Sequence, residues 1–160
     1  MTNDMTKREL SVVLRELACG QATPLCKEWT EAWSDDTDID ELLDKYVRGF
    51  DFAVKNDFPP LDFCRRNFDK DDLHRHHIYI DEEVDLEAVE SGYYVFLGTC
   101  KGRLVVKDLK AVTVYVRHDS RIDVSAFDGA KVFVTYYDHS SGGCVSDGWS
   151  KIKRYNRTKK

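Results

Sequence analysis

The sequence lacks the long apolar segments and the cysteine pairs that mark membrane and secreted proteins. No apolar run approaches the roughly 18–20 residues of a membrane span, and the first ten residues, MTNDMTKREL, contain no apolar signal segment. The five cysteines are odd in number and scattered, with no CxxC pair, so neither a disulfide framework nor a zinc ribbon is expected. These absences predict an intracellular, cytoplasmic protein with reduced thiols and no membrane partner.

The motifs of common enzyme classes are also missing. The chain contains no GxSxG nucleophile elbow, no HExxH metal motif and no glycine-rich phosphate loop. Residues 118–120 and 138–140 each combine His, Asp and Ser, but neighbours in a turn point in different directions, whereas a catalytic triad needs each side chain to be oriented by the next. Short side chains that bond to nearby backbone explain these positions better. We therefore predict no catalytic residue and no cofactor.

Charge is distributed unevenly along the 160 residues. Residues 1–90 hold 11 Lys and Arg against 23 Asp and Glu, a net charge of −12, whereas residues 91–160 hold 13 against 6, a net charge of +7. The hydrophobic spacing changes at the same place, from a helical period to an alternating one. These changes predict a helical module at 1–70, a junction with a first strand at 71–90, a β-repeat module at 91–150 and a basic tail at 151–160.

The acidic half has the apolar spacing of four helices. A capping box at Thr6 begins the first helix, and the Thr23-Pro24 pair begins the second. The acidic stretch DDTDIDELL begins a third helix that extends to about Lys55, and a short fourth helix begins at Pro60. The tryptophans and phenylalanines of this half fit the core of a helical module better than a ligand-binding box.

The basic half repeats every ten residues. Because ten is even, side chains keep their parity from block to block, so the first, third and fifth positions should face one way in every block. Each block predicts one strand of about five or six residues and a turn that contains Asp, Gly or Ser. The third positions of the blocks that begin at 92, 102, 112, 122, 132 and 142 are Tyr94, Leu104, Val114, Val124, Val134 and Cys144. A basic row along one edge is expected from the tenth positions Lys101, Arg121, Lys131 and Lys151.

Two folds satisfy this pattern. An antiparallel meander or sandwich accounts for the strands, and Asp128-Gly129 is a hairpin signal. In a β-solenoid each block forms one side of a coil, and like residues stack between coils. The turns of a meander need not resemble one another, whereas HDSR, DGAK and DHSS recur at constant spacing. We therefore predict an α+β protein in which a helical N-terminal module, placed to cover the first coil, precedes a ten-residue-repeat β-solenoid.

Three stretches of the sequence carry a family resemblance. They are IDELLDKYVRGFDFAVKNDFPPLDF at 39–63, LHRHHIYIDEEVDL at 73–86, and VYVRHDS at 114–120 with the V-x-V blocks after it. In these stretches, which span most of residues 38–140, the chain resembles an uncharacterised family of short proteins from gut bacteria and their mobile elements, of the prophage type. The resemblance implies a helical N-terminal module joined to a C-terminal β-repeat. It carries no catalytic signature, and it implies a regulator, a host-factor antagonist or a virion accessory protein.

The junction LHRHHIYID concentrates three of the five histidines. If this stretch is extended, His74 and His76 lie on one face, and a His-x-His pair on a strand is a common half of a zinc or iron site. Asp71, Asp72 or Asp81 would supply oxygen ligands. The two isoleucines that follow share the parity of that face, so the stretch also fits a polar linker that turns into the core. Metal binding at His74 and His76 is the weaker of these two interpretations.

The C-terminal KIKRYNRTKK places six cations in ten residues. Phosphate contact by Lys and Arg, together with stacking on an aromatic ring, is typical of weak nucleic-acid binding. A tail that keeps the last strand from pairing edge to edge is an equally physical explanation, and contact with the acidic half of the chain is another. The residues expected to contact nucleic acid in the first case are Lys151, Lys153, Arg154, Tyr155 and Arg157.

The even positions of the repeat are expected to face solvent and to offer a recognition surface. Aromatic side chains among charged ones are typical of protein interfaces. We therefore predict a non-enzymatic protein-binding or assembly module. A nucleic-acid-associated protein that uses the basic tail is the alternative, and a metal-dependent enzyme at the junction histidines is the third possibility. The predicted binding surface includes Tyr115, Arg117, Phe133 and Tyr137, with Thr113, Asp123 and Thr135 beside them.

Overall fold

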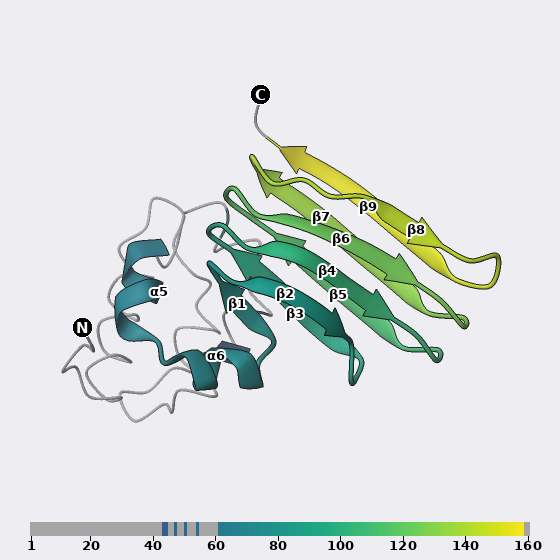
Figure 1. The fold of residues 1–160 in the computed structure, drawn as a ribbon, viewed down its shortest axis with the longest axis horizontal. Helices are drawn as coiled ribbons and strands as arrows, with labels where there is room; N and C mark the ends of the chain where they lie inside the picture. The colour runs from purple at the N-terminus through teal and green to yellow at the C-terminus, as the bar shows by residue number, and fades with distance from the viewer. Residues whose placement is uncertain (1–42, 45–46, 48–49, 51–53, 55–60, 159–160) are drawn as a thin grey trace, which may run out of the picture. The chain divides into compact units, whose positions relative to one another are not determined.

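The computed structural model describes residues 43–44, 47, 50, 54 and 61–158 (Figure 1). The chain forms two compact units, Met1–His76 and His77–Lys160. The boundary between them falls inside the predicted junction, after the last helix and before the first strand. Among the described residues, no helix is both long and apolar enough to cross a membrane.

Two short helices end the first unit: α5 (Leu61–Asn67) and α6 (Lys70–Arg75). The helix predicted to begin at Pro60 is confirmed as α5, which buries Cys64. Of the third predicted helix, only residues 43–44, 47, 50 and 54 are described, and they are helical. The first two predicted helices lie outside the described residues, so the helical module and its cover over the first coil stay predictions.

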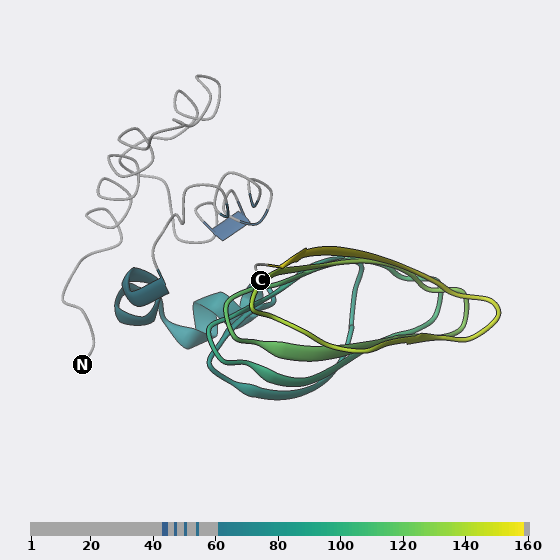
Figure 2. The same ribbon diagram turned by 90° about the horizontal axis from the view of Figure 1, so that it is seen from above.

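The second unit consists of short strands that alternate between two parallel sheets. The strands of sheet A lie in the order β1-β3-β5-β7-β9, and those of sheet B in the order β2-β4-β6-β8. Figure 2 shows successive turns of the chain superposed, with the sheets along the two long sides. The strands are β1 (Ile78–Ile80), β2 (Glu83–Glu87), β3 (Gly92–Leu97), β4 (Lys101–Val106), β5 (Ala111–Val116), β6 (Arg121–Ala126), β7 (Lys131–Asp138), β8 (Cys144–Ser146) and β9 (Lys151–Thr158).

Each described strand pairs in parallel with the strand one full turn away. In sheet A, Val114 pairs with Tyr94 on one side and with Val134 on the other. In sheet B, Val124 pairs with Leu104. One turn therefore takes two ten-residue blocks, one for each sheet. The predicted β-solenoid is confirmed, with about four turns, and the alternative antiparallel meander is wrong.

The turns recur because the seventh position adopts a left-handed backbone in the five blocks that begin at 92, 102, 112, 122 and 132. Asp108, His118, Asp128 and Asp138 have φ values of 57°, 60°, 58° and 55°, and Gly98 has a φ of 72°. Glycine reaches this region freely, and Asp and His reach it more readily than most residues. The repeated Asp, Gly or His at this position therefore encodes the corners at which the chain passes from one sheet to the other.

The Asp128-Gly129 pair forms the turn expected of a hairpin, but it joins strands that do not pair. Both residues have positive φ, 58° and 81°, as in a type I′ turn. The turn connects β6 to β7, which belong to different sheets. Its two N–H groups donate to the side chains of Asp147 and Ser150, one turn later, at 2.9 and 3.0 Å. Bonds to the next coil thus replace the strand-to-strand bonds of a hairpin.

The core consists of the first, third and fifth positions of the blocks, as parity predicts. Val114, Val124 and Val134 are fully buried in one apolar cluster that both sheets share. The hydroxyl group of Ser120, a ninth-position residue at a corner, donates to the carbonyl oxygen of Gly98 at 3.1 Å. Such bonds satisfy the buried polar groups where the chain turns.

The predicted basic row is in fact two rows on opposite corners. Lys101 pairs with Arg121 at the start of the sheet B strands. Lys131 pairs with Lys151 at the start of the sheet A strands. Because successive blocks belong to different sheets, their tenth positions alternate between the two corners. The expectation of one edge was therefore wrong.

Candidate interaction surface

The four residues predicted to bind a partner lie on the outer side of sheet A. Tyr115 is on β5, Phe133 and Tyr137 are on β7, and Arg117 directly follows β5. The rings of Tyr115 and Tyr137 lie 6.3 Å apart. Parity places all four on the face opposite the core, because they alternate with the buried valines of the same strands.

Two of these four residues are not available at the surface. Arg117 is 6% exposed, Tyr137 is 4% exposed, and the neighbouring Thr135 is also buried. Arg117 Nε donates to Asp138 Oδ2 at 2.9 Å, which forms an ion pair between adjacent coils. The expectation that Arg117, Thr135 and Tyr137 face solvent is therefore wrong. Phe133 is the one of the four predicted residues that is well exposed.

Aromatic side chains cross the outer side of sheet A. The rings of Tyr93 and Tyr115 are stacked, with centroids 6.2 Å apart and planes 15° apart. Tyr115 in turn contacts Tyr137, which makes a diagonal across β3, β5 and β7. Such diagonals form because aromatic side chains reach a neighbour two positions along the adjacent strand. On the same face Tyr93, Phe133 and Tyr155 are exposed.

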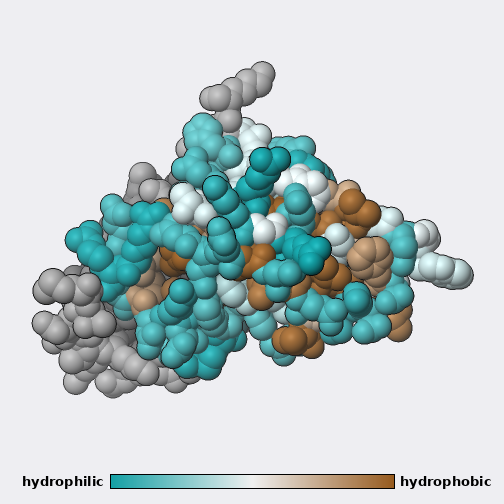
Figure 3. Space-filling model, viewed as in Figure 1, coloured by the Kyte–Doolittle hydropathy of each residue, from teal (hydrophilic) through white to brown (hydrophobic). Residues whose placement is uncertain are grey.

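A second exposed apolar feature lies along one corner of the coil. Val89, Leu109 and Trp149 are 76%, 80% and 87% exposed, and we call them the apolar row. They occupy the eighth position of alternate blocks, with Gly129 between Leu109 and Trp149. Since neighbouring parallel strands are about 4.8 Å apart, the row extends over roughly 14 Å. Figure 3 shows hydrophobic side chains at the surface near the ends of the sheet B strands.

The opposite corner has a different character. Its eighth positions are Thr99, Asp119 and His139, all polar and exposed. The sequence therefore alternates apolar and polar residues at the eighth position, a signal that becomes readable only when one turn is known to take 20 residues. Sequence reasoning on the ten-residue block missed the apolar row for this reason.

Leu109 holds its exposed side chain on an unfavourable backbone. Its φ is +63°, and the preceding Asp108 has a φ of +57°. A left-handed backbone costs a non-glycine residue roughly 1–2 kcal/mol, and one turn later Gly129 occupies the equivalent place. An exposed leucine at such a position adds little to the core. This combination of strain and exposure points to a role for the side chain outside the fold.

The predicted basic tail is the last strand of sheet A. β9 pairs with β7 from Lys151, opposite Lys131, to Thr158, opposite Asp138. On β9 the side chains of Ile152, Arg154 and Asn156 are in register with the buried residues of β7. Lys153, Tyr155 and Arg157 alternate with them, so these three side chains share the outer face of the sheet. The ammonium group of Lys153 lies 6.0 Å from the ring centre of Tyr155.

Arg154 has a structural role that the sequence did not reveal. It pairs in register with the buried Val134. Its guanidinium group lies 4.6 Å from the ring centre of Tyr136 and donates to the carbonyl oxygen of Gly142 at 2.7 Å. Arg154 therefore covers the end of the core, which leaves fewer of its donors for a phosphate group.

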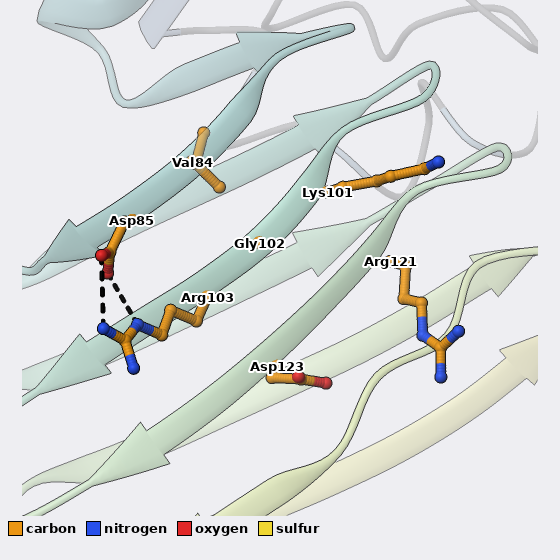
Figure 4. Close-up of a pocket in the computed structure, with 7 residues that line it drawn as sticks. All are labelled: Val84, Asp85, Lys101, Gly102, Arg103, Arg121 and Asp123. Atoms are coloured by element: carbon orange, nitrogen blue, oxygen red, sulfur yellow. Dashed lines mark hydrogen bonds and ion pairs between the residues drawn. The ribbon is translucent and has the colours of Figure 1, made fainter.

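A shallow, strongly charged depression lies on the outer side of sheet B (Figure 4). Arg103 Nε and Nη2 donate to the two carboxylate oxygens of Asp85 at 2.7 and 3.2 Å. The hydrogen bond from Arg103 lowers the pKa of Asp85. The floor is a glycine because a Cβ atom on Gly102, at φ +142°, would lie 1.8 Å from the carbonyl oxygen of Val84. Three cations and two carboxylates line the depression, and one cation, Arg103, is paired with Asp85, so charges of both signs are mixed along it and the net excess is a single positive charge. Its seven lining residues are Val84, Asp85, Lys101, Gly102, Arg103, Arg121 and Asp123.

The junction histidines do not have the geometry that the metal prediction requires. His74 lies in the last turn of α6 and His76 caps that helix, so this stretch is not extended. Residues two apart on a helix do not face each other. Asp72 pairs with Arg75, and Asp81 accepts the N–H of Thr99 at 2.9 Å. Among the described residues, no group of three His, Cys, Asp or Glu side chains is arranged to hold a metal ion.

The corner at 118–120 and 138–140 uses its polar side chains on neighbouring backbone. His118 Nδ1 accepts the N–H of Gly98 at 3.0 Å, and Ser120 Oγ accepts the N–H of Cys100 at 3.1 Å. Ser140 Oγ donates to the carbonyl oxygen of Val116 at 2.9 Å. These bonds join successive coils, and they account for the recurrence of His and Ser without a nucleophile and base pair.

The exposed features of the second unit are thus an aromatic outer face on sheet A, an apolar row along one corner and a basic last strand. Comparison of the chain with protein-family models, with curated proteins and with solved structures finds no match.

Proposed function

We propose that the protein is a non-enzymatic protein-binding module that recognises its partner through the apolar row and the adjacent aromatic side chains of sheet A. The observation that carries this proposal is the apolar row itself. Three large apolar side chains lie exposed at one corner of a regular coil, and one of them is on a strained backbone. A regular fold does not need this arrangement, whereas a partner with an apolar groove or helix face would bury it.

The aromatic residues of sheet A extend this surface. Tyr93 and Phe133 occupy the second positions of their blocks, four residues after the eighth positions at the same corner. Both are exposed. Aromatic side chains contribute disproportionately to protein interfaces because they bury a large area with few rotatable bonds. The corner and the adjacent strand starts thus make one continuous candidate surface.

We expect the double substitution Leu109→Gly/Trp149→Ser to abolish capture of the partner without loss of stability. Leu109→Gly relieves the left-handed strain, which offsets the greater backbone freedom of glycine in the unfolded chain. Affinity capture from a lysate of the native host, followed by quantitative mass spectrometry, should show a specific protein retained at least about tenfold less by this variant, since losing two anchors costs more than about 1.4 kcal/mol.

The matched control changes the opposite corner. Asp119→Ala/His139→Ala alters two exposed side chains at the same block position but away from the apolar row. This variant should retain the partner as the unmodified protein does. Equal retention by the Leu109→Gly/Trp149→Ser variant would show that the apolar row is not the recognition surface.

Contact with nucleic acid is the second candidate, and the outer side of β9 is the observation that favours it. Lys153, Tyr155 and Arg157 combine two cations with an exposed ring. The net charge of −5 opposes long-range attraction to a polyanion. We therefore expect at best micromolar, sequence-indifferent binding of single-stranded nucleic acid at low salt.

Substitution tests this candidate better than truncation, because deletion of 151–160 would remove a core-covering strand. Lys153→Ala/Arg157→Ala should reduce the slope of log K against log salt by about 1.4, from two lost phosphate contacts. Lys101→Ala/Arg121→Ala, on the other sheet, is the control. Absence of any binding at low salt would remove this candidate, and a nanomolar, salt-resistant complex would displace protein binding as the preferred function.

A further inference from the structure

The solenoid carries opposite charges at its two ends. Residues 77–90, which contain β1 and β2, hold six Asp and Glu and no Lys or Arg. β9, at the other end, holds four Lys and Arg and no carboxylate. Between them, residues 91–150 are nearly balanced, with seven Lys and Arg against six Asp and Glu. The unit as a whole is close to neutral, so its charge is polarised along the direction in which the coils stack.

The acidic end presents a strand edge. In the described part of the chain β2 pairs with β4 alone. Ala88, which follows β2, donates its N–H to the carbonyl oxygen of Val105 at 2.8 Å, so the even-numbered residues of this stretch bond to β4. The backbone groups of Glu83, Asp85 and Glu87 therefore point to the other edge, because successive residues of a strand bond to opposite sides. All three side chains are exposed.

The basic end presents an edge of the complementary parity. In the described residues β9 pairs with β7 alone. Lys151 donates its N–H to the carbonyl oxygen of Ala130 at 3.0 Å, so the odd-numbered residues of β9 bond toward β7. The backbone groups of Ile152, Arg154 and Asn156 therefore point away from β7. The edge-facing residues are thus even-numbered on β9 and odd-numbered on β2.

We propose that the protein associates head to tail with a second copy of itself, with β9 of one copy pairing in parallel with β2 of the next. In this arrangement the second copy, and not the helical module, covers the edge of β2 in the first coil. Coils within one chain pair in the same way, with even-numbered backbone groups of the earlier strand facing odd-numbered groups of the later strand. Between β4 and β6, for example, Arg121 donates its N–H to the carbonyl oxygen of Cys100 at 2.7 Å. Aligning Lys153 with Glu83 keeps this parity and also aligns Arg157 with Glu87. Opposite charges directly across a strand pair are stabilising.

The charges also select this pairing over others. Pairing of β9 with β9 of another copy would place four cations against four, and pairing of β2 with β2 would place three carboxylates against three. Only the head-to-tail arrangement brings unlike charges together. A heterologous contact of this kind adds copies in one direction and does not close on itself unless the rotation permits a ring.

Sedimentation equilibrium of the full chain, over a range of concentrations and at low and high salt, tests the proposal. The unmodified protein should associate reversibly at low salt and less at high salt. Lys153→Glu/Arg157→Glu and Glu83→Lys/Glu87→Lys should each weaken self-association by at least about tenfold, because each converts two attractive pairs into repulsive ones. All four side chains are exposed. Glu87 forms an ion pair with Lys107 of its own chain at 3.2 Å, but an exposed pair contributes little to stability, so both variants should stay folded with melting temperatures close to that of the unmodified protein.

A mixture of the two charge-reversed variants provides the decisive measurement. Their ends are complementary again, so the mixture should form heterodimers that neither variant forms with itself. Asn156→Pro tests the backbone hydrogen bonds between β9 and β2. The substitution removes an N–H group that faces the free edge and leaves the bonds to β7 in place, so it should also weaken association. Lys101→Glu/Arg121→Glu, in the middle of the solenoid, is the control for net charge and should associate as the unmodified protein does.

Two results would overturn the proposal. One is a monomer at every concentration and salt tested. The other is an association that survives both charge reversals, or that is lost in Leu109→Gly/Trp149→Ser and kept in the charge-reversed variants, since copies would then meet through the apolar row.

Discussion

We expect Val124→Asp to unfold the solenoid at room temperature. Val124 is fully buried on the inner side of β6, where it pairs in register with Leu104 and Cys144 on the neighbouring turns. A carboxylate at this place has no partner and must either lose its hydration or be protonated, at a cost of several kcal/mol. The total free energy of unfolding of a small domain is about 5–15 kcal/mol. Circular dichroism with thermal and urea denaturation measures the effect.

Thr113→Asp is the matched control for this substitution. Thr113 lies on β5, one position before the buried Val114, so its side chain is on the outer face. The new carboxylate stays in water there, and the cost should be that of lower β propensity, below about 1 kcal/mol. Equal melting temperatures for Val124→Asp and Thr113→Asp would contradict the assignment of inner and outer faces.

The inner face was predictable because parity depends only on local geometry. An even repeat with valine at alternate positions leaves one choice for the buried side, and Val114, Val124 and Val134 are all on it. The solenoid itself followed from the turns. Asp128 and His118 occupy the same block position because both tolerate a left-handed backbone, and the corners from Gly98 to Asp138 all use that conformation.

The grouping of the outer side chains was not predictable in the same way. The sequence shows a period of ten, but like residues become neighbours at a spacing of 20, because successive blocks lie in different sheets. One predicted basic row is two rows for this reason. The apolar row at Val89, Leu109 and Trp149 appears only when the eighth positions are sorted by corner.

Burial on the outer face also escaped prediction, because parity says which way a side chain points and not what it meets. Arg117 was expected to be exposed on the outer side of sheet A. It is buried because it meets Asp138 of the next coil, 21 residues later. The junction histidines were misplaced for a related reason. The strand that was expected to include His74 and His76 begins only at Ile78, because the helix α6 continues up to Arg75. The local sequence pattern does not fix the residue at which helical spacing gives way to strand spacing.

The solenoid separates the residues that hold the fold from those that remain for recognition. The inner positions and the corner bonds repeat at every turn, so stability is a sum of similar contributions from adjacent coils. Outer positions can then vary without loss of the fold, as the change from Gly129 to Leu109 at one corner illustrates. The two proposed interactions use different parts of this surface: the apolar row is lateral, and the charged strands β2 and β9 are at the ends.

The buried ion pair between Arg117 and Asp138 should be the largest polar contribution to stability on the outer face. Both side chains are almost fully buried, at 7% and 12% exposure. We expect Arg117→Met to lower the free energy of unfolding by about 3–5 kcal/mol at neutral pH, because it leaves the carboxylate of Asp138 buried without its cation. The double variant Arg117→Met/Asp138→Asn should recover part of this loss, since no charge is then left unpaired.

The pH dependence distinguishes a lost ion pair from lost packing. Burial raises the pKa of Asp138, but the hydrogen bond and charge of Arg117, together with the smaller contributions of His118, outweigh it, so the pKa of Asp138 in the folded protein is lowered. The stabilisation is therefore complete above the unfolded pKa of about 3.9 and is lost as the pH falls through the folded value. In Arg117→Met the largest influence is burial, opposed only by the smaller contributions of His118, so we expect the pKa of Asp138 to rise. Protonation on acidification then relieves the unpaired charge. The difference in unfolding free energy between Arg117→Met and the unmodified protein should thus be largest near pH 7 and shrink toward pH 4, as measured by urea denaturation. A difference that stays constant with pH, as expected for the double variant, would assign the effect of Arg117 to packing alone.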